Sequence, residues 1–226
     1  KRNYKKAKWI SQTNNFRKEK FCIDNNLKIN SVKVLPNYPP LSWDVKSEIV
    51  VKKPVKIVYV GYSINEKGNY IKELLSWLAA QKIKIQLDFY LVNQQSSPKE
   101  VHSEYVNLEI RVFDAINYNK LPDILKNYNV GLILYKPTSD NWIFNAPNKL
   151  FEYLACNLDV WFPSSMIATM PYENSNIYPK VTSLDFNNLN GIDFSNLINR
   201  ENLSKSQNRY FCEDIYIRLK KVIMQL

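Results

Sequence analysis

Short apolar runs alternate with helical stretches along the middle of this chain, and this alternation constrains the fold more than any other feature. The run VKIVYV (55–60) is continuous and β-branched, as expected of a strand that is buried on both faces of a parallel sheet. The next stretch, 68–81, places apolar residues at helical spacing: Ile71, Leu74, Leu75 and Leu78. Strands that alternate with helices of this length predict a doubly wound, Rossmann-like α/β domain with a parallel sheet.

The same alternation continues as far as Pro163. Four further strands are predicted, at 85–92, 108–113, 130–135 and 158–163. Three further helices are predicted, near 99–106, at 118–128 and from Pro147 onward. The pattern fades after Pro163, and the chain ends in a predicted amphipathic helix over roughly 205–223.

The first forty residues do not fit this domain. A strand is predicted at 7–13 and a helix at 14–27, and VKVLPNYPP (32–40) reads as a strand that runs into a proline-stiffened linker. One strand and one helix cannot bury a core by themselves. We therefore predict three parts: the tail of an N-terminal domain with its linker at 1–40, the α/β domain at 41–204, and the terminal helix at 205–226.

The net charge of +10 restricts the classes of partner. Such a charge suits nucleic acid, an anionic membrane surface or a phosphorylated ligand. Residues 1–20 carry eight Lys and Arg against the single Glu19, but no RNP sequence or paired-finger spacing accompanies them. No nucleic acid partner is expected, and two interpretations of the basic residues stay open: a solvated face and contact with an anionic membrane surface.

Cysteine and histidine usage restricts the compartment and the metal chemistry. The three cysteines are far apart and odd in number, which fits the reducing cytoplasm. With one histidine, His102, a zinc cluster is not expected, and a surface role for His102 is favoured over a catalytic one. No apolar run approaches the ~20 residues that span a bilayer, and residues 1–20 lack the apolar core of a signal peptide.

The stretch NAPNKLFEYLACNLDV (145–160) opens a mostly apolar helix with a lysine and a carboxylate. In open α/β sheets, ligands bind at the carboxyl ends of the strands, where helix N-termini point. The free N–H groups of Asn148 and Lys149 suit a phosphate, and Glu152 can accept two hydrogen bonds from the vicinal diol of a ribose. These residues predict a nucleoside diphosphate site. The simpler alternative is that Glu152 complements the helix dipole and pairs with Lys149.

A second stretch, VGYSINEKGNY (60–70), joins the first predicted strand to the first predicted helix of the domain. Gly61 permits a tight turn there, and Lys67 can reach a phosphate above the sheet. The alternative is an exposed loop lysine. Two lysines and a helix N-terminus at one edge of the sheet favour the nucleotide site.

These stretches resemble a known family. PNKLFEYLACNLDV (147–160) is similar to the signature helix of GT-B glycosyltransferases, in the group that carries an E-x7-E or related motif and uses nucleotide-sugar donors. The linker at 32–40, the phosphate-binding loop VGYSINEKG (60–68), the strand VGLILYKP (130–137) and the terminal helix also resemble their counterparts in that family. The resemblance implies that 41–204 is a donor-binding domain and that neither metal nor another cofactor is needed for donor binding.

The resemblance also implies roles for single residues. Glu152 matches the second motif glutamate, which holds the ribose hydroxyls, and Lys67 matches a lysine that contacts the diphosphate. Asn148 and Lys149 would line the diphosphate and the sugar. Phe113 lies at the strand end where the family stacks the base, although a core phenylalanine is an equal alternative.

Three positions depart from the family pattern. Phe144 stands eight residues before Glu152, where the first motif glutamate is expected. Tyr62 replaces an arginine of the first loop, which removes one fixed cation. Asn157 replaces the usual glycine after the helix, and asparagine also adopts the left-handed conformation.

The expected function is transfer of a sugar from a nucleoside diphosphate to a glycan or lipid-linked acceptor in polysaccharide biosynthesis, at the inner face of the membrane. The catalytic side chain is expected from the N-terminal domain. A second interpretation is a nucleotide-binding α/β module or regulatory partner subunit without transferase chemistry. A third, a nucleic-acid-binding protein, depends on charge alone.

Overall fold

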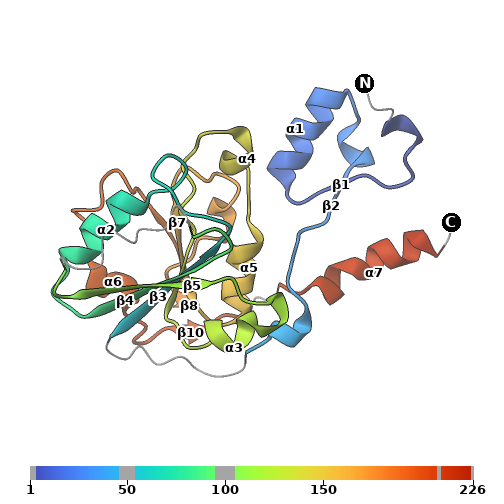
Figure 1. Cartoon of the computed structure of the whole chain (residues 1–226). Helices are drawn as coiled ribbons and strands as arrows, with labels where there is room; N and C mark the ends of the chain where they lie inside the picture. The colour runs from blue at the N-terminus through green and yellow to red at the C-terminus, as the bar shows by residue number, and fades with distance from the viewer. Residues whose placement is uncertain (1–3, 46–53, 95–104, 208–209, 225–226) are drawn as a thin grey trace.

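The computed structural model describes residues 4–45, 54–94, 105–207 and 210–224, and a parallel sheet forms its centre (Figure 1). The six strands lie in the order β5-β4-β3-β6-β7-β9, and every neighbouring pair is parallel. Their bounds are Val55–Gly61 (β3), Ile85–Leu91 (β4), Leu108–Asp114 (β5), Val130–Leu132 (β6), Asp159–Pro163 (β7) and Val181–Leu184 (β9). Taken in chain order, this is the 3-2-1-4-5-6 arrangement of a doubly wound sheet, and the predicted fold class is confirmed.

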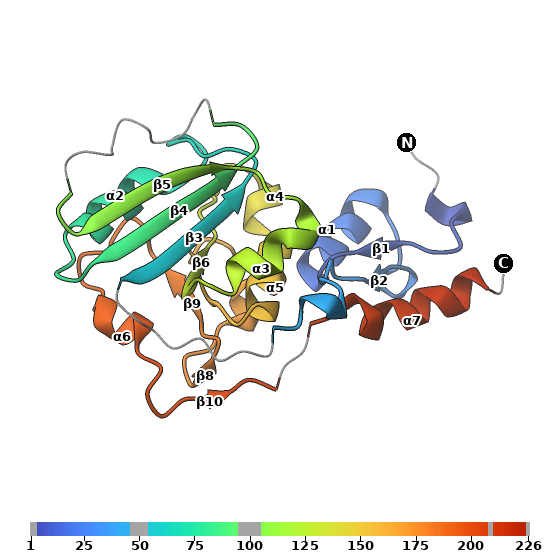
Figure 2. The same ribbon diagram turned by 60° about the horizontal axis from the view of Figure 1, so that its bottom comes forward.

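Helices cover both faces of the sheet because its strands send alternate side chains into two cores (Figures 1 and 2). On β3, Ile57 and Tyr59 enter one core, and Val58 enters the other. Helices α2 (Ile71–Ala79) and α6 (Phe194–Ile198) cover the first core. Helices α3 (Leu121–Leu125) and α5 (Asn148–Ala155) cover the second.

The strands predicted for this domain are present, and the helix predicted at 118–128 is shorter, since it forms as a 3-10 turn (Tyr118–Lys120) followed by α3. The strand predicted at 130–135 ends at Leu132, because the chain then bonds to the loop after β3: the Tyr70 N–H donates to the Leu134 carbonyl at 2.9 Å. Strand β9 lies beyond Pro163, where the pattern fades, and was not predicted. The helix predicted near 99–106 and His102 fall almost wholly outside the described residues.

The first residues form a small unit of their own. Helix α1 (Asn15–Asn25) packs on a short parallel pair, β1 (Ser11–Gln12) and β2 (Lys33–Val34), as predicted in type but with shorter strands. The predicted domain boundaries stay predictions. The remaining short elements are η1 (Tyr4–Lys6), η2 (Ile29–Ser31), η3 (Leu41–Trp43), η5 (Tyr118–Lys120), α4 (Asp140–Ile143), η6 (Met170–Tyr172), β8 (Ile177–Tyr178) and β10 (Ser204–Lys205).

The terminal helix is shorter than predicted. It begins at Cys212 rather than near 205, because Ser204 and Lys205 pair with β8 instead (α7, Cys212–Ile223). The linker bonds to its start: the Cys212 N–H donates to the Pro39 carbonyl at 3.0 Å, and the Glu213 carboxylate accepts from the Leu41 N–H at 2.9 Å. Helix α7 then projects toward the α1 unit (Figures 1 and 2).

Candidate functional site

The carboxyl ends of β3 and β6 form the crevice of the sheet. The order of the strands reverses between these two neighbours, and in doubly wound sheets ligands bind at that point. The loop after β3 (61–70) and the loop after β6 (133–147) meet there, since the Lys136 N–H donates to the Gly68 carbonyl at 2.9 Å. Both stretches that the sequence singled out therefore lie at one edge of the sheet.

Gly61 is needed for space rather than for a turn. It is the last residue of β3, and its φ is not positive, so the conformation that only glycine adopts freely is not used there. A Cβ on Gly61 would lie 2.5 Å from Cε1 of Tyr59. Beyond it, Tyr62 is 70% exposed and Lys67 is exposed, so both are open to solvent at this edge.

Pro147 caps α5 and does not start it. Its ψ of 153° is extended, so the helix begins at Asn148, one residue later than predicted. A proline fits either place, because it lacks the N–H that would go unpaired at a helix start. The N–H groups of Asn148 and Lys149 still have no intrahelical acceptor and are available to an anion.

Glu152 is a buried carboxylate near the start of α5. It is 8% exposed, and within the described residues it accepts no hydrogen bond and joins no ion pair. Burial raises the pKa of Glu152, and the charge of Lys149 opposes that shift. Burial likewise lowers the pKa of Lys149, opposed by Glu152. The two groups influence each other without the direct ion pair that the simpler interpretation invoked.

The charge of this carboxylate affects two tyrosines. Burial and then the charge of Glu152 raise the pKa values of Tyr118, to about 12, and of Tyr135. The Tyr135 ring in turn stacks on Trp142, with centroids 4.2 Å apart. Glu152 therefore influences both tyrosines, and no residue in the described part of the chain donates a hydrogen bond to its oxygens.

Phe113 lies further from the crevice, near the carboxyl end of the edge strand β5, which is separated from β3 by β4. It is 36% exposed and stacks on Tyr90 with centroids 5.0 Å apart, while the Arg111 guanidinium lies 5.4 Å from its centroid. Phe113 is thus a partly open ring at the edge of the sheet and is not a core residue. Whether it stacks on a base stays a prediction.

Lys136 was missed by the sequence interpretation, which noted only the loop that contains it. Its ammonium donates to the Glu66 carbonyl at 2.8 Å and to Glu73 at 3.0 Å, and it lies 5.3 Å from the centroid of the Tyr70 ring. These partners tie the loop after β6 to the loop after β3. A lysine directly after a buried strand is the only sequence feature that pointed to it.

Two of the three departures from the family pattern, Phe144 and Asn157, have a structural role. Phe144 stacks on Phe16 of α1, with centroids 6.4 Å apart and ring planes at 19°. Asn157 adopts the left-handed conformation with a φ of 61°, as predicted. Its side-chain amide donates to the Val45 carbonyl, which holds the linker against the end of α5.

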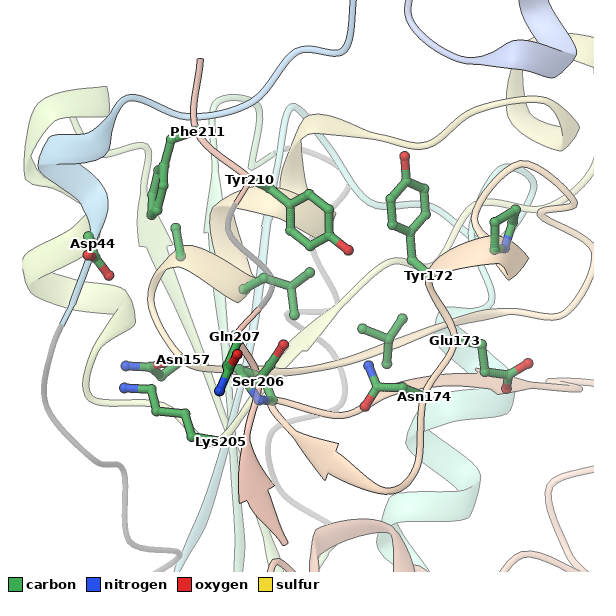
Figure 3. A pocket seen from close by; sticks show the side chains of 15 residues that line it. Asp44, Asn157, Tyr172, Glu173, Asn174, Lys205, Ser206, Gln207, Tyr210 and Phe211 are labelled. Atoms are coloured by element: carbon green, nitrogen blue, oxygen red, sulfur yellow. The ribbon is translucent and has the colours of Figure 1, made fainter. Parts of the chain in front are cut away.

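A cavity of about 430 Å³ lies at the opposite end of α5 (Figure 3). It is bordered by Ala155, by Val181 at the start of β9 and by Tyr210 before α7. Figure 3 shows amide, hydroxyl and ammonium groups on its rim, with the Glu173 side chain directed away from it. Because it lies at the amino ends of β7 and β9, it is not part of the crevice site.

Two further observations concern metal ions and membrane spans. No group of three His, Cys, Asp or Glu within them comes together in a way that could hold a metal ion. None of their helices has both the length and the apolar character that crossing a membrane requires.

Neither a protein-family model nor a curated protein sequence matches the chain. Among solved structures, Alr3699/HepE from Anabaena in complex with UDP-glucose is similar with a TM-score of 0.62 and 13% identity, over 97% of this chain and 64% of that one. The lipopolysaccharide outer core galactosyltransferase WaaB, apo form, has a TM-score of 0.62 and 14% identity, over 97% and 62%. A glycosyltransferase from Rickettsia africae has a TM-score of 0.51 and 11% identity, over 75% and 48%.

The chain therefore spans less than two thirds of the length of each of these proteins. At such identities the likeness establishes the fold alone. The fold class that the resemblance predicted is confirmed: the chain has the Rossmann-like α/β architecture of these structures.

Proposed function

We propose that this chain is the part of a GT-B glycosyltransferase that binds the nucleotide-sugar donor. One observation carries the proposal: Glu152 is a buried carboxylate that lacks a hydrogen-bond donor among the described residues, one turn into the helix that starts at the crevice. A buried charge without partners is costly, so such a group points to a ligand that supplies donors. The two hydroxyls of a ribose would supply them.

The rest of the site supports the same ligand. The unpaired N–H groups at the start of α5 and the charge of Lys149 suit a diphosphate next to that ribose. The similar protein HepE was crystallised with UDP-glucose, which supports a nucleoside diphosphate sugar as the donor. Donor binding of this kind needs no metal ion.

The acceptor and the setting follow from the family resemblance. The proposed reaction transfers a hexose to a glycan or lipid-linked acceptor in polysaccharide biosynthesis, in the cytoplasm at the inner face of the membrane. The basic residues near the N-terminus suit contact with its anionic lipids.

A thermal-shift panel tests the nucleotide assignment. The chain is mixed with UDP, GDP, ADP, their sugar conjugates and, as a control for charge alone, a short oligonucleotide. We expect stabilisation by at least one nucleotide family, since a ligand that binds only the folded state raises the melting temperature. Stabilisation by the oligonucleotide alone would contradict the proposal and favour a nucleic-acid-binding protein.

Removing the charge of Lys149 should affect the diphosphate more than the nucleoside. The ammonium is half-buried beside the helix start, so Lys149→Ala should weaken nucleoside diphosphate binding about 10-fold. Lys67 is exposed and more strongly screened, so Lys67→Ala should cost about 2- to 5-fold. Calorimetry with a nucleoside and its diphosphate measures both effects.

Lys84→Ala is the matched control for these two variants. Lys84 is exposed and precedes β4 at the opposite edge of the sheet, so its loss should leave affinity unchanged. Equal losses for the nucleoside and the diphosphate would place Lys67 and Lys149 away from the phosphates.

The chain by itself should bind nucleotide and transfer no sugar. Outside the sheet domain, the described residues before the linker form only α1, two short strands and short 3-10 turns, which offer no acceptor wall. In GT-B enzymes the reaction follows closure of two domains, which excludes water and aligns the acceptor. A radiolabelled-sugar assay with the 226-residue chain should show no product, and detection of transfer would contradict this expectation.

A non-catalytic nucleotide-binding module is the second candidate. It is favoured by Phe144, which stands where the family has its first motif glutamate and packs on α1 instead of offering a carboxylate. Turnover by the longer protein would decide between the two candidates. A protein that binds nucleotide and never transfers sugar would be the module.

A further inference from the structure

Helix α1 contacts the loop that leads into α5, although the two are far apart in sequence (Figures 1 and 2). The Phe144 carbonyl accepts two hydrogen bonds from α1 and its cap, from Asn14 Nδ2 at 3.0 Å and from Arg17 Nε at 3.1 Å. Arg17 Nη2 also donates to the Asn141 carbonyl at 3.2 Å and to the side chain of that residue.

These contacts come from one face of α1. Asn14, Arg17 and Lys20 follow at intervals of three, so they lie on one side of the helix. Asn14 is 6% exposed and has a double role, because its Oδ1 accepts from the Arg17 N–H at 2.9 Å and caps the helix. Lys20 adds an ion pair to Asp140 at 3.0 Å.

The bonded carbonyls lie at the end of α4. The last carbonyls of a helix have no intrahelical donor, and the rigid fork of a guanidinium can serve two of them at once. Directly after them, the Asn145 carbonyl accepts from the hydroxyl of Thr169, which is fully buried, at 2.9 Å. The loop is thus held from two sides immediately before Pro147 caps α5.

We propose that Arg17 is a positioning residue for the nucleotide site: it holds residues 141–147 and so sets the direction in which the start of α5 faces the crevice. The proposal rests on the proposed function for the identity of its ligand. It also gives a structural role to Phe144, whose carbonyl and ring both contact α1 or its cap. The α1 unit and the nucleotide site are therefore coupled through this loop.

The test uses Arg17→Ala, Arg17→Lys and, as a matched control, Lys18→Ala. The Lys18 side chain forms no hydrogen bond or ion pair with the described residues. Hydrogen exchange is followed at the amides of Trp142, Ile143 and Phe144, which donate to the carbonyls of Ser139 and Asp140. Affinity for the best nucleotide of the thermal-shift panel is measured in parallel.

Arg17→Ala should speed exchange at these amides about 10-fold and weaken nucleotide binding by a similar factor. Arg17→Lys should show most of the same changes in exchange and affinity, because an ammonium cannot donate to both carbonyls as the guanidinium does. Millimolar guanidinium should slow the exchange again and restore binding in Arg17→Ala, with no effect on wild type or Lys18→Ala. A merely structural contact would not show this rescue of nucleotide affinity.

Unchanged exchange in Arg17→Ala would overturn the proposal, as would faster exchange with unchanged nucleotide affinity. If the wild-type chain binds no nucleotide, the proposed function fails and the ligand part of the proposal fails with it. The exchange rates then still show whether Arg17 holds the loop at residues 141–147.

Discussion

Glu152→Ala is expected to weaken nucleotide binding about 10- to 100-fold while the fold stays intact. Hydrogen bonds to a charged acceptor contribute about 1.5–3 kcal/mol, and about 1.4 kcal/mol corresponds to tenfold in affinity. The buried carboxylate has no protein donor among the described residues, so the loss should appear in binding and not in stability. Calorimetry and chemical denaturation measure the two separately.

Glu152→Gln sharpens this prediction. The amide keeps the shape of the side chain and removes the buried charge, so the free energy of unfolding should stay equal or rise. Glu201→Gln, at an exposed position, is the control and should change neither quantity. A dissociation constant that is unchanged in both Glu152 variants would refute the ribose assignment.

The pH dependence of binding follows from the same residue. Burial raises the pKa of Glu152 above its ordinary 4.5, and only the ionised form accepts both ribose hydroxyls. Nucleotide affinity should therefore fall as the pH is lowered through this raised pKa. Without nucleotide the stability shows the opposite trend, because the contribution of Glu152 is largest below pH 4.5 and is lost as the pH rises through its folded-state pKa. Both trends should vanish in Glu152→Gln.

The sequence predicted the central sheet because its strands are buried on both faces. Runs such as 55–60 and 85–92 have few polar residues, and this continuous apolar character is specific to strands covered by helices on two sides. Strand β9 has only four residues, in which two partly exposed polar residues stand between buried Val181 and Leu184, so it shows no alternation. Such a short strand is recognisable only from its pairing with β7.

The arrangement of the candidate site could be predicted from the sequence where its residues belong to one helix. The start of α5 and the carboxylate one turn later lie in one helix, so spacing alone places Lys149 and Glu152 together. Arg17 and the Phe144 carbonyl are 127 residues apart, and no periodicity connects them. Gly61 shows a different limit of sequence prediction. Glycine is required there because the ring of Tyr59 occupies the space of a Cβ, and not because of the backbone conformation of Gly61.

Gly131→Ala is expected to cause the largest loss of stability of any substitution considered. The Tyr153 ring of α5 lies directly on Gly131 of β6, and a Cβ there would be 2.3 Å from two of the ring carbons. The Tyr153 hydroxyl accepts from the Val60 N–H at 3.2 Å and lies 3.4 Å from the Leu132 carbonyl, to which it donates. Tyr153 thus fixes α5 to both strands that flank the crevice.

The added methyl group must push this buried ring away. Overpacking costs about 1–3 kcal/mol, and loss of the hydrogen bonds of a buried hydroxyl costs about 1–3 kcal/mol more. Gly131→Ala should therefore lower the free energy of unfolding by about 2–6 kcal/mol, measured by chemical denaturation. Gly191→Ala is the control: nothing lies within 4 Å of a Cβ there, so stability should change by less than about 1 kcal/mol.

A double variant separates the steric clash with the Tyr153 ring from the intrinsic cost of placing alanine, which favours helices, in a strand. Tyr153→Leu removes the ring, so Gly131→Ala added to it should cost far less than it does alone, and the two losses should be strongly non-additive. The three atoms nearest to a Cβ at Gly131 all belong to the Tyr153 ring, so additive losses would mean that the ring does not rest on this glycine. In that case Tyr153 would not fix α5 beside the crevice, and the proposed contact of Glu152 with a ribose would lose this support.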